Sequence, residues 1–354
     1  MNKVLLLGGT GAIGTYLKDI LVSHNIETFI TSRSHRNNTG CLHYIEGNAH
    51  NMDFLTRVCE EKYDVIVDFM SYKTDEFSQR VDILLQSTKQ YVFISSARVY
   101  SDKEHPIKET SPRLVDVAED DIYLQTDEYA LTKARQENLL TKSRYKNYTI
   151  VRPYITYGDY RLQLGVLEKE EWLFRALKGR TVVFSEGIAE KITTMTNGFD
   201  VANGIYSIMG KTESYGETYH ITGNYLAKWY DIWTIYSNVL TNMTGNKPKL
   251  KLVDITTFLS VRSSDLKWQV IYDRLYNRDF DASKIKSIMG DVSLTSLETG
   301  LAKCLSNFLE KPVFKDINWK SEAIKDRITG ERTPLKEICG IKNKVKYIYY
   351  RYKI

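Results

Sequence analysis

Short apolar runs alternate with helical patterns along the first part of the chain. The run Val4–Leu7 is continuous, which is typical of a strand buried on both faces of a parallel sheet. Further strand patterns lie at Glu27–Thr31, Leu42–Glu46, Tyr63–Phe69 and Tyr91–Ile94. Helical spacing appears between them, at about 15–23 and at 75–87. Strands that alternate with helices predict an α/β fold with a doubly wound parallel sheet.

A glycine-rich turn follows the first strand at once. Gly8 allows a tight turn, Gly11 lets a pyrophosphate approach the backbone, and Gly14 lets the next helix pack closely on the strand. The N-terminus of that helix offers free N–H groups to phosphates. Strand, glycine turn and helix in this order predict a dinucleotide site in a Rossmann fold, and a plain strand-to-helix turn is the alternative. The residues predicted to bind the cofactor here are Gly8, Thr10, Gly11, Ala12, Ile13 and Gly14.

The end of the second strand bears on the choice of cofactor. An acid at this place holds the ribose 2′-OH of NAD, but the chain has Thr31-Ser32-Arg33-Ser34. Ser32 and Arg33 suit a 2′-phosphate, so NADP(H) is favoured. The alternative is an exposed loop arginine, with NAD bound through other ribose contacts. Asn48, after the third strand, is either a partner for the adenine edge or a simple turn residue.

Three residues form a candidate catalytic group. Tyr129 and Lys133 lie at i and i+4 in a stretch rich in helix formers, so they share one face. The ammonium stabilises a tyrosinate, and such a tyrosine moves a hydroxyl proton while hydride passes to or from a nicotinamide. Ser96, at the end of the fifth strand, is placed to hydrogen-bond the same substrate oxygen. An exposed helix pair is the alternative for Tyr129 and Lys133.

With these motifs the chain resembles the extended short-chain dehydrogenase/reductase family, in its NAD-dependent epimerase/dehydratase group. The likeness covers about residues 3 to 310. The matching segments are Gly8–Gly14, Ser95–Tyr100, Tyr129 with Lys133, Ile150–Pro153, Tyr157-Gly158, Asp200–Ala202, Phe280–Ile285 and Ile288–Gly290. The resemblance implies a nucleotide-activated sugar as substrate, Ser96 as the catalytic hydroxyl, and Pro153 beside the nicotinamide. It implies epimerisation or reduction of a keto-sugar, and the sequence leaves both open.

Departures from the family pattern limit the reaction. Dehydratases of this group carry Thr-Asp-Glu at the end of the fifth strand, where this chain has Ser-Ser-Ala-Arg. Thr126-Asp127-Glu128 comes just before Tyr129 instead, and we expect it to start the helix, so a dehydratase is disfavoured. Met70 replaces the usual alanine after the fourth strand. Thr193 stands where an arginine often grips a substrate diphosphate, and Lys191 is a possible substitute.

The later part of the chain predicts a smaller α/β substrate lobe. We expect the dinucleotide-binding domain at 1–157, with a return segment at about 195–222, and the substrate lobe at 158–194 and 223–337. Helices are expected at Glu168–Leu177 and Ala227–Leu240, and strands at Thr181–Phe184 and from Leu250. The aromatic face of the second helix, with Trp229, Trp233 and Tyr236, is interpreted as core.

Three arginines are candidates for binding the substrate. Arg161 and Arg274 suit a diphosphate because guanidinium pairs well with phosphate oxygens. An ion pair with Asp273 or Asp279 is the alternative for Arg274. Arg98 either faces the substrate or anchors the loop 106–114.

Composition adds a tail and excludes several classes. The 354 residues carry a net charge of +5, and the segment 338–354 interleaves lysines with tyrosines and contains no acid. The rest is near neutral, so nucleic acid is an unfavoured partner, although a non-catalytic nucleotide- or RNA-binding protein of this fold is the alternative function. The tail is interpreted as solvated or packed on a subunit of a homodimer; contact with an acidic membrane surface or a partner enzyme is its alternative. The four cysteines and six histidines predict no metal site, and the absence of a long apolar run predicts a cytoplasmic protein.

Overall fold

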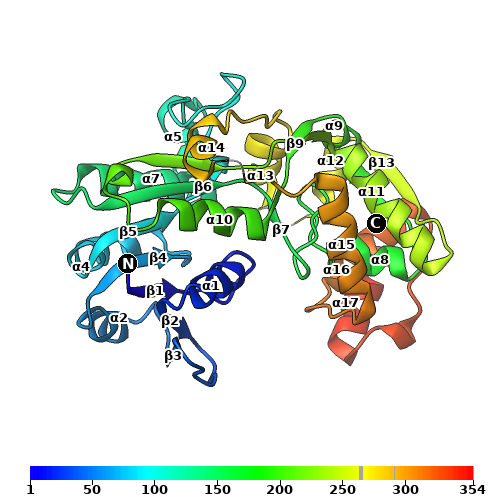
Figure 1. Cartoon of the computed structure of the whole chain (residues 1–354). Coiled ribbons are helices and arrows are strands. Elements are labelled where there is room, and N and C mark those ends of the chain that lie inside the picture. The colour runs from blue at the N-terminus through cyan, green and yellow to red at the C-terminus, as the bar shows by residue number, and fades with distance from the viewer. Residues whose placement is uncertain (263–265, 291, 354) are drawn as a thin grey trace. The chain divides into compact units, whose positions relative to one another are not determined.

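A computed structural model describes residues 1–262, 266–290 and 292–353 (Figure 1). The chain divides into two compact units. The first unit comprises 1–156, 194–225 and 279–297, and the second comprises 157–193, 226–278 and 298–354. The segment 279–297, which we expected in the substrate lobe, clusters with the first unit, and the expected tail clusters with the second.

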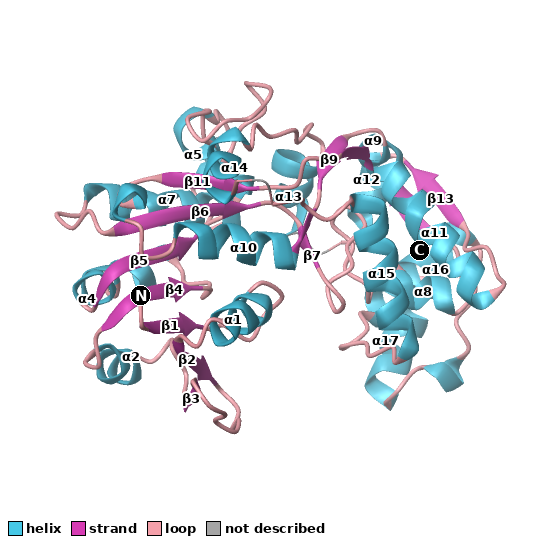
Figure 2. Cartoon of the chain, viewed as in Figure 1, coloured by secondary structure: helices cyan, strands magenta, loops and turns pink. Residues whose placement is uncertain are grey.

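The first unit is built on a seven-stranded sheet in the described part of the chain. Its strand order is β11-β6-β5-β4-β1-β2-β3, and each pair of neighbours is parallel. The predicted doubly wound sheet is therefore confirmed (Figure 2). The strands are β1 (Lys3–Leu7), β2 (Glu27–Ser32), β3 (Leu42–Glu46), β4 (Tyr63–Asp68), β5 (Thr88–Ile94), β6 (Tyr148–Pro153) and β11 (Thr218–Ile221).

Helices cover both faces of this sheet. Val4 and Leu6 of β1 pack in one cluster with α1 and α10, and Leu5 and Leu7 pack in another with α2, α4 and α7. Burial on both faces explains why the first strand is a continuous apolar run. The remaining elements of this unit are α1 (Gly14–Ser23), α2 (Met52–Cys59), α3 (Thr74–Ser78), α4 (Val81–Gln86), η1 (Ala97–Val99), α5 (Leu114–Val117), α6 (Asp121–Leu124), α7 (Tyr129–Lys142), β10 (Thr196–Asn197), α10 (Gly198–Ile208), η2 (Thr212–Ser214) and α14 (Ser283–Met289).

The prediction of a single helix at 75–87 is wrong, because α3 and α4 are separate helices. In a continuous helix the carbonyl of Glu76 accepts from the backbone N–H of Arg80. Here that carbonyl accepts from the Arg80 guanidinium, and the Arg80 N–H donates to Phe77 O at 3.0 Å. A second guanidinium nitrogen of Arg80 donates to the carbonyl of His50. A contact with a residue 30 positions away thus interrupts a locally favourable helix.

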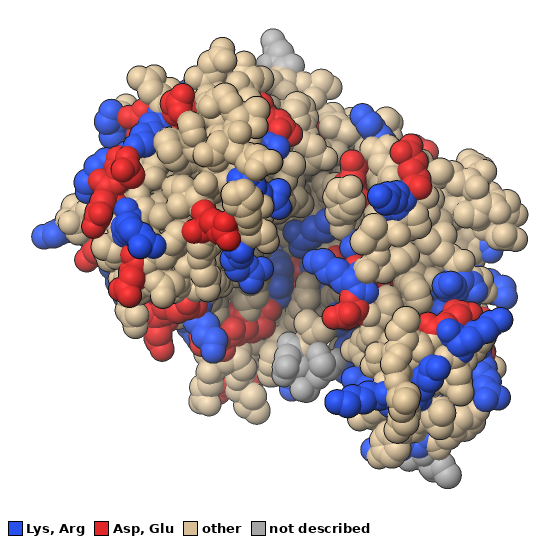
Figure 3. Space-filling model, turned by 90° about the horizontal axis from the view of Figure 1, so that it is seen from below, with Lys and Arg blue, Asp and Glu red and all other residues tan. Residues whose placement is uncertain are grey.

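The second unit is mostly helical and contains a short parallel pair of β8 and β13. Trp172 stacks on Tyr236 with ring centroids 4.6 Å apart, and Trp229 and Trp233 are also buried, so the aromatic face of α11 lies in the core. Lys and Arg side chains gather at the lower right of Figure 3. The elements are β7 (Thr156–Tyr157, at the boundary), α8 (Leu173–Leu177), β8 (Val182–Ser185), α9 (Glu186–Ala189), β9 (Ile192–Thr194), β12 (Leu226–Lys228), α11 (Trp229–Thr244), β13 (Leu250–Val253), α12 (Ile255–Ser260), α13 (Lys267–Gln269), η4 (Val270–Arg274), α15 (Leu297–Glu310), α16 (Trp319–Thr329), η5 (Leu335–Glu337) and α17 (Ile341–Tyr352).

The helix expected at Glu168–Leu177 is shorter than predicted, since α8 begins only at Leu173. The carbonyl of Glu171 accepts from Lys325 Nζ at 2.7 Å, and the indole of Trp172 donates to Leu162 O at 3.0 Å. These contacts hold the preceding residues in turns. Over the residues that the structure covers, none of the helices combines the length and the apolar character that a membrane crossing requires.

Candidate active site

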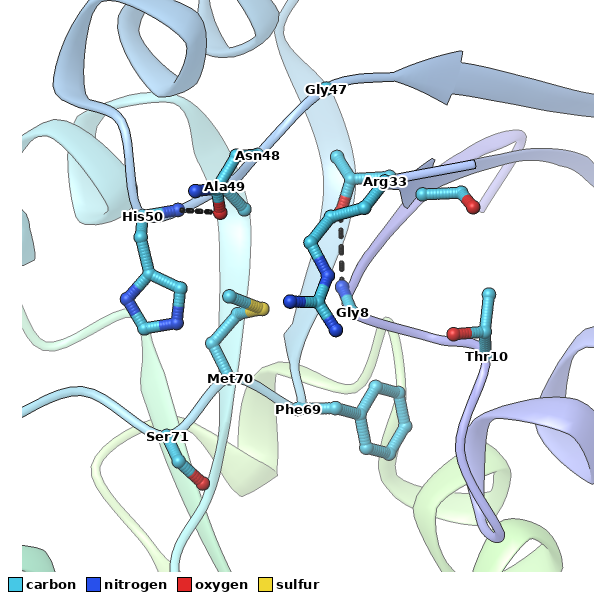
Figure 4. Close-up of a pocket in the computed structure, with 12 residues that line it drawn as sticks. Gly8, Thr10, Arg33, Gly47, Asn48, Ala49, His50, Phe69, Met70 and Ser71 are labelled. Atoms are coloured by element: carbon cyan, nitrogen blue, oxygen red, sulfur yellow. Dashed lines mark hydrogen bonds between the residues drawn. The ribbon is translucent and has the colours of Figure 1, made fainter. Parts of the chain in front are cut away.

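A cavity of about 290 Å³ opens at the carboxyl ends of β1, β2, β3 and β4 (Figure 4). Ligands of doubly wound sheets bind at this edge. Five residues that the sequence assigns to the cofactor line it, namely Gly8, Thr10, Ser32, Arg33 and Asn48. The other lining residues are Thr31, Gly47, Ala49, His50, Phe69, Met70 and Ser71. Among these, Ala49 and His50 were not singled out from the sequence.

The floor of the cavity is a turn that requires glycine at position 8. Gly8 has a φ of +68°, and a Cβ there would lie 2.7 Å from Met70 Sδ. Its N–H donates to Thr31 Oγ1 at 3.0 Å, as the dashed line in Figure 4 shows. The Met70 side chain, larger than the alanine of the family pattern, thus packs directly against the turn.

The rest of the turn fits a dinucleotide phosphate. Nothing lies within 4 Å of the place where a Cβ of Gly11 would stand, so a ligand can approach the backbone there. A Cβ on Gly14 would lie 2.5 Å from Gly9 O, so this residue must be small for α1 to start where it does. Ala12 and Ile13 continue the turn into α1, whose first N–H groups suit an anion.

Polar groups from β2 and β3 form the next part of the wall. Ser32 Oγ donates to Ser34 O at 2.8 Å. The Arg33 side chain is exposed, and its guanidinium lies between Met70 and Gly8 in the view of Figure 4. Asn48 Oδ1 accepts from His50 N at 3.1 Å, which is the geometry of a turn residue. This contact agrees with the turn interpretation of Asn48, which also lines the cavity.

We expect Arg33→Ala to weaken NADPH binding about tenfold or more, because a charge-assisted hydrogen bond to a 2′-phosphate is worth roughly 1.5–3 kcal/mol. NADH, which lacks that phosphate, should lose less than about twofold by the same reasoning. Calorimetric titration of both cofactors measures this. Arg36→Ala is the matched control. Arg36 is not among the residues that line the cavity, and its guanidinium lies 5.7 Å from the ring centre of Tyr44. Equal weakening of NADPH and NADH would remove the preference for NADP(H).

Lys133 is buried at the carboxyl ends of β4 and β5. Its Nζ donates to Ile94 O at 2.8 Å and to Met70 O at 3.3 Å, and the residue is 2% exposed. The same nitrogen lies 5.9 Å from the ring centre of Tyr129. The predicted pair therefore shares one face of α7, with the ammonium held in place by two backbone carbonyls.

Ser96 and Arg98 complete the surroundings of Tyr129. Ser96 caps η1, where its Oγ accepts from Arg98 N at 3.3 Å. The Arg98 guanidinium pairs with Glu128 and lies 5.3 Å from the ring centre of Tyr129. Tyr129 itself is 40% exposed, so its ring stands at the surface of the first unit. Lys133 and Arg98 thus both lie near the ring of Tyr129, and Ser96 is linked to this group through the backbone of Arg98.

Two buried carboxylates support this neighbourhood and were not found from the sequence. Asp68 accepts from Tyr91 Oη at 2.7 Å and from Met70 N at 2.9 Å, and burial raises its pKa. Glu137 accepts from Ser95 Oγ at 2.6 Å and from Arg152 Nη2 at 2.7 Å. Although burial alone would raise the pKa of Glu137, Arg152 and Ser95 hold it below its usual range. Because the Ser95 hydroxyl donates to Glu137, Ser96 is the candidate of this serine pair for a substrate oxygen.

Burial lowers the pKa of Lys133 to about 8, although the carboxylates of Asp68 and Glu137 oppose this. Since the unfolded lysine keeps its proton to higher pH, the unfolded state binds more protons between about pH 8 and 10.5, and stability rises with pH there. The free energy of unfolding of the wild type, measured relative to that of Lys133→Met, should therefore increase by about 2 kcal/mol between about pH 7 and 9.5. Urea unfolding measures this difference. Lys142→Met, at the exposed end of α7, is the control, and a difference that does not change with pH would contradict the buried ammonium.

The remaining predicted residues are Pro153, in the first unit, and two arginines of the second unit. Pro153 ends β6 and pairs with Ile221 in register. Arg161 is exposed, with its backbone N–H donating to Gly158 O at 2.9 Å. Arg274 is buried, pairs with Asp273 and donates to Gly165 O at 3.0 Å, which favours the ion-pair alternative over a diphosphate clamp.

Comparison with known proteins places the chain among relatives of known family and fold. The model of the NAD dependent epimerase/dehydratase family matches residues 4–221. The chloroplast stem-loop binding protein of 41 kDa b of Arabidopsis thaliana is 26% identical over 240 residues, which are 63% of this chain and 59% of that protein. The dTDP-glucose 4,6-dehydratase of Escherichia coli is 26% identical over 252 residues, 69% of this chain and 64% of that protein. The chain thus matches about six-tenths of the length of each.

A solved structure shows the same fold over most of the chain. It is the UDP-glucuronic acid 4-epimerase of Bacillus cereus in complex with UDP-glucuronic acid and NAD. It has a TM-score of 0.66 and 16% identity, and the match covers 87% of this chain and 99% of that one.

Proposed function

Because the chain belongs to the NAD-dependent epimerase/dehydratase family, we propose that it catalyses hydride transfer on a nucleotide-activated sugar, as an epimerase or a keto-sugar reductase. One observation carries the proposal. Lys133 Nζ is fixed by Ile94 O and Met70 O beside the ring of Tyr129, at the sheet edge where the glycine turn offers a dinucleotide site.

Each residue has a distinct role in this proposal. Tyr129 gives or takes the proton of the sugar hydroxyl, and Ser96 orients the oxygen that carries it. Lys133 keeps a positive charge near the phenol, which favours the tyrosinate. A bound nicotinamide dinucleotide would rest on Gly11 and the start of α1 and would supply or accept hydride.

We propose that the reaction is not a 4,6-dehydration, although one relative is named for that activity. Elimination needs an acid and a base beside the sugar. The residues after β5 are Ser95, Ser96, Ala97 and Arg98, and none is a carboxylate. The nearest carboxylate on the chain before Tyr129, Glu128, accepts from Ala130 N at 2.7 Å and pairs with Arg98, so it serves as the cap of α7.

The test is a panel of UDP- and dTDP-linked hexoses and hexuronic acids, incubated with the purified chain and NAD, NADH or NADPH. An epimerase converts a sugar nucleotide with no net change in the cofactor, whereas a reductase consumes one equivalent of reduced cofactor for each product. Chromatography and NMR of the sugar distinguish the two. No turnover of any nucleotide sugar, with the cofactor site occupied, would refute the proposal.

A second candidate function follows from the stem-loop binding relative. In this alternative the chain is a non-catalytic nucleotide- or RNA-binding protein of the same fold. Gel-shift titration with a stem-loop RNA tests it, with and without NAD. Tight RNA binding combined with an inactive panel would favour this alternative over hydride transfer.

A further inference from the structure

The C-terminal helix α17 presents an apolar stripe to solvent. The apolar face of a surface helix normally packs on the core. In α17 the buried residue is Tyr347, whereas Ile341, Val345, Ile348 and Tyr352 are exposed, from 42% at Ile348 to 80% at Ile341. Their spacing of i, i+4, i+7 and i+11 puts them on one side of the helix, away from Tyr347.

Basic residues flank this stripe on both sides. At about 100° per residue, the four residues of the stripe span an arc of roughly 60°, and Tyr349 at one edge widens it to roughly 100°. Lys342, Lys346 and Lys353 follow on one flank, and Lys344 and Arg351 lie on the other, with no acid anywhere in α17.

The helix is held in this orientation by buried polar contacts within the second unit. Tyr347 Oη donates to Asp326 Oδ2 at 2.5 Å and accepts from Thr333 N at 2.8 Å. Arg351 Nε donates to Glu331 O at 3.2 Å. Tyr347 also packs with Trp319 and Ile338 in a small core. The outward stripe is therefore part of the folded unit and is not a frayed end.

We propose that α17 docks the protein on an anionic phospholipid surface, with Ile341, Val345, Ile348 and Tyr352 inserted at the level of the headgroups. An apolar stripe between lysine flanks is the pattern of a helix that lies in the membrane interface. Tyrosine suits this level because its ring is apolar and its hydroxyl is polar. Each lysine near an anionic surface strengthens binding roughly fivefold, and this attraction falls with salt. Charge complementarity favours an anionic lipid surface over a second copy of the chain, because a stripe with cations on both flanks repels another such stripe.

The experiment is flotation of the full chain with vesicles, without cofactor or substrate. We expect binding to vesicles of phosphatidylcholine with phosphatidylserine, little binding to phosphatidylcholine alone, and release by salt. Val345→Glu should lower binding about tenfold or more, because it puts a charge in the stripe and removes apolar contact. The control Val313→Glu makes the same change at an exposed valine of the same unit, 56% exposed against 61% for Val345, and should retain binding.

Point substitution is preferable to removing the tail, since truncation would take Tyr347 out of the core. Thermal unfolding should give the same midpoint for both variants, since each position is exposed. Absence of wild-type binding to anionic vesicles, or equal losses in both variants, would overturn the proposal. So would a dimer in sedimentation that Val345→Glu dissociates, or a stem-loop RNA complex that the same change abolishes, because either assigns the stripe to another occupant. The assay contains no nucleotide sugar, so its result is independent of the proposed reaction.

Discussion

Tyr129→Phe is expected to lower turnover of the nucleotide sugar by about 10²- to 10⁴-fold, the range for removing a positioned general acid–base group. The substitution keeps the ring beside Lys133 and Arg98 and deletes only the hydroxyl. Steady-state kinetics with the sugar identified in the panel measures the loss. Cofactor affinity, measured by calorimetry, should change less than about twofold, because the glycine turn is untouched.

Tyr225→Phe is the matched control for this experiment. Tyr225 belongs to the same unit and is 44% exposed, close to the 40% of Tyr129. Its substitution should leave turnover unchanged. A Tyr129→Phe variant with full activity would refute the catalytic assignment, whereas a loss that both variants share would point to a general effect of removing a surface hydroxyl.

Gly14→Ala is expected to destabilise the protein by at least about 3 kcal/mol, the upper part of the range for overpacking. The new methyl group would meet Gly9 O at 2.5 Å and Gly9 C at 2.6 Å. These are backbone atoms, so relief requires α1 to move away from the turn. The same movement would disturb the phosphate site, and NAD affinity should fall with stability. Urea unfolding and calorimetric titration with NAD measure the two effects.

Gly11→Ala separates binding from folding in the same turn. Its methyl group meets nothing within 4 Å, so the free energy of unfolding should change by less than about 0.5 kcal/mol. NAD affinity should nevertheless fall about tenfold or more, because the methyl group would occupy the space of the pyrophosphate. If Gly11→Ala binds NAD as the wild type does, the dinucleotide does not approach at this position.

Local features of the sequence determined the strands of the sheet and the positions of the candidate site residues along the chain. The apolar run Val4–Leu7 and the turn Gly8–Gly14 specify a buried strand followed by a helix, because side-chain periodicity and glycine conformation act over a few residues. The same reasoning places Tyr129 and Lys133 on one helical face, which depends only on the rise and turn of α7.

Only the tertiary structure decided what surrounds these residues. Arg80 splits α3 from α4 through the carbonyl of His50, and Lys133 rests on Ile94 and Met70. The hydrogen bond from the Tyr347 hydroxyl to Asp326 holds Tyr347 inside the unit, so the stripe on the other side of α17 faces outward. The partners in these contacts are 21 to 63 positions apart in the sequence, so no local periodicity encodes them. Burial makes these hydrogen bonds decisive, because leaving a polar group unpaired inside the protein costs free energy. That cost favours the one arrangement in which each buried group has a partner.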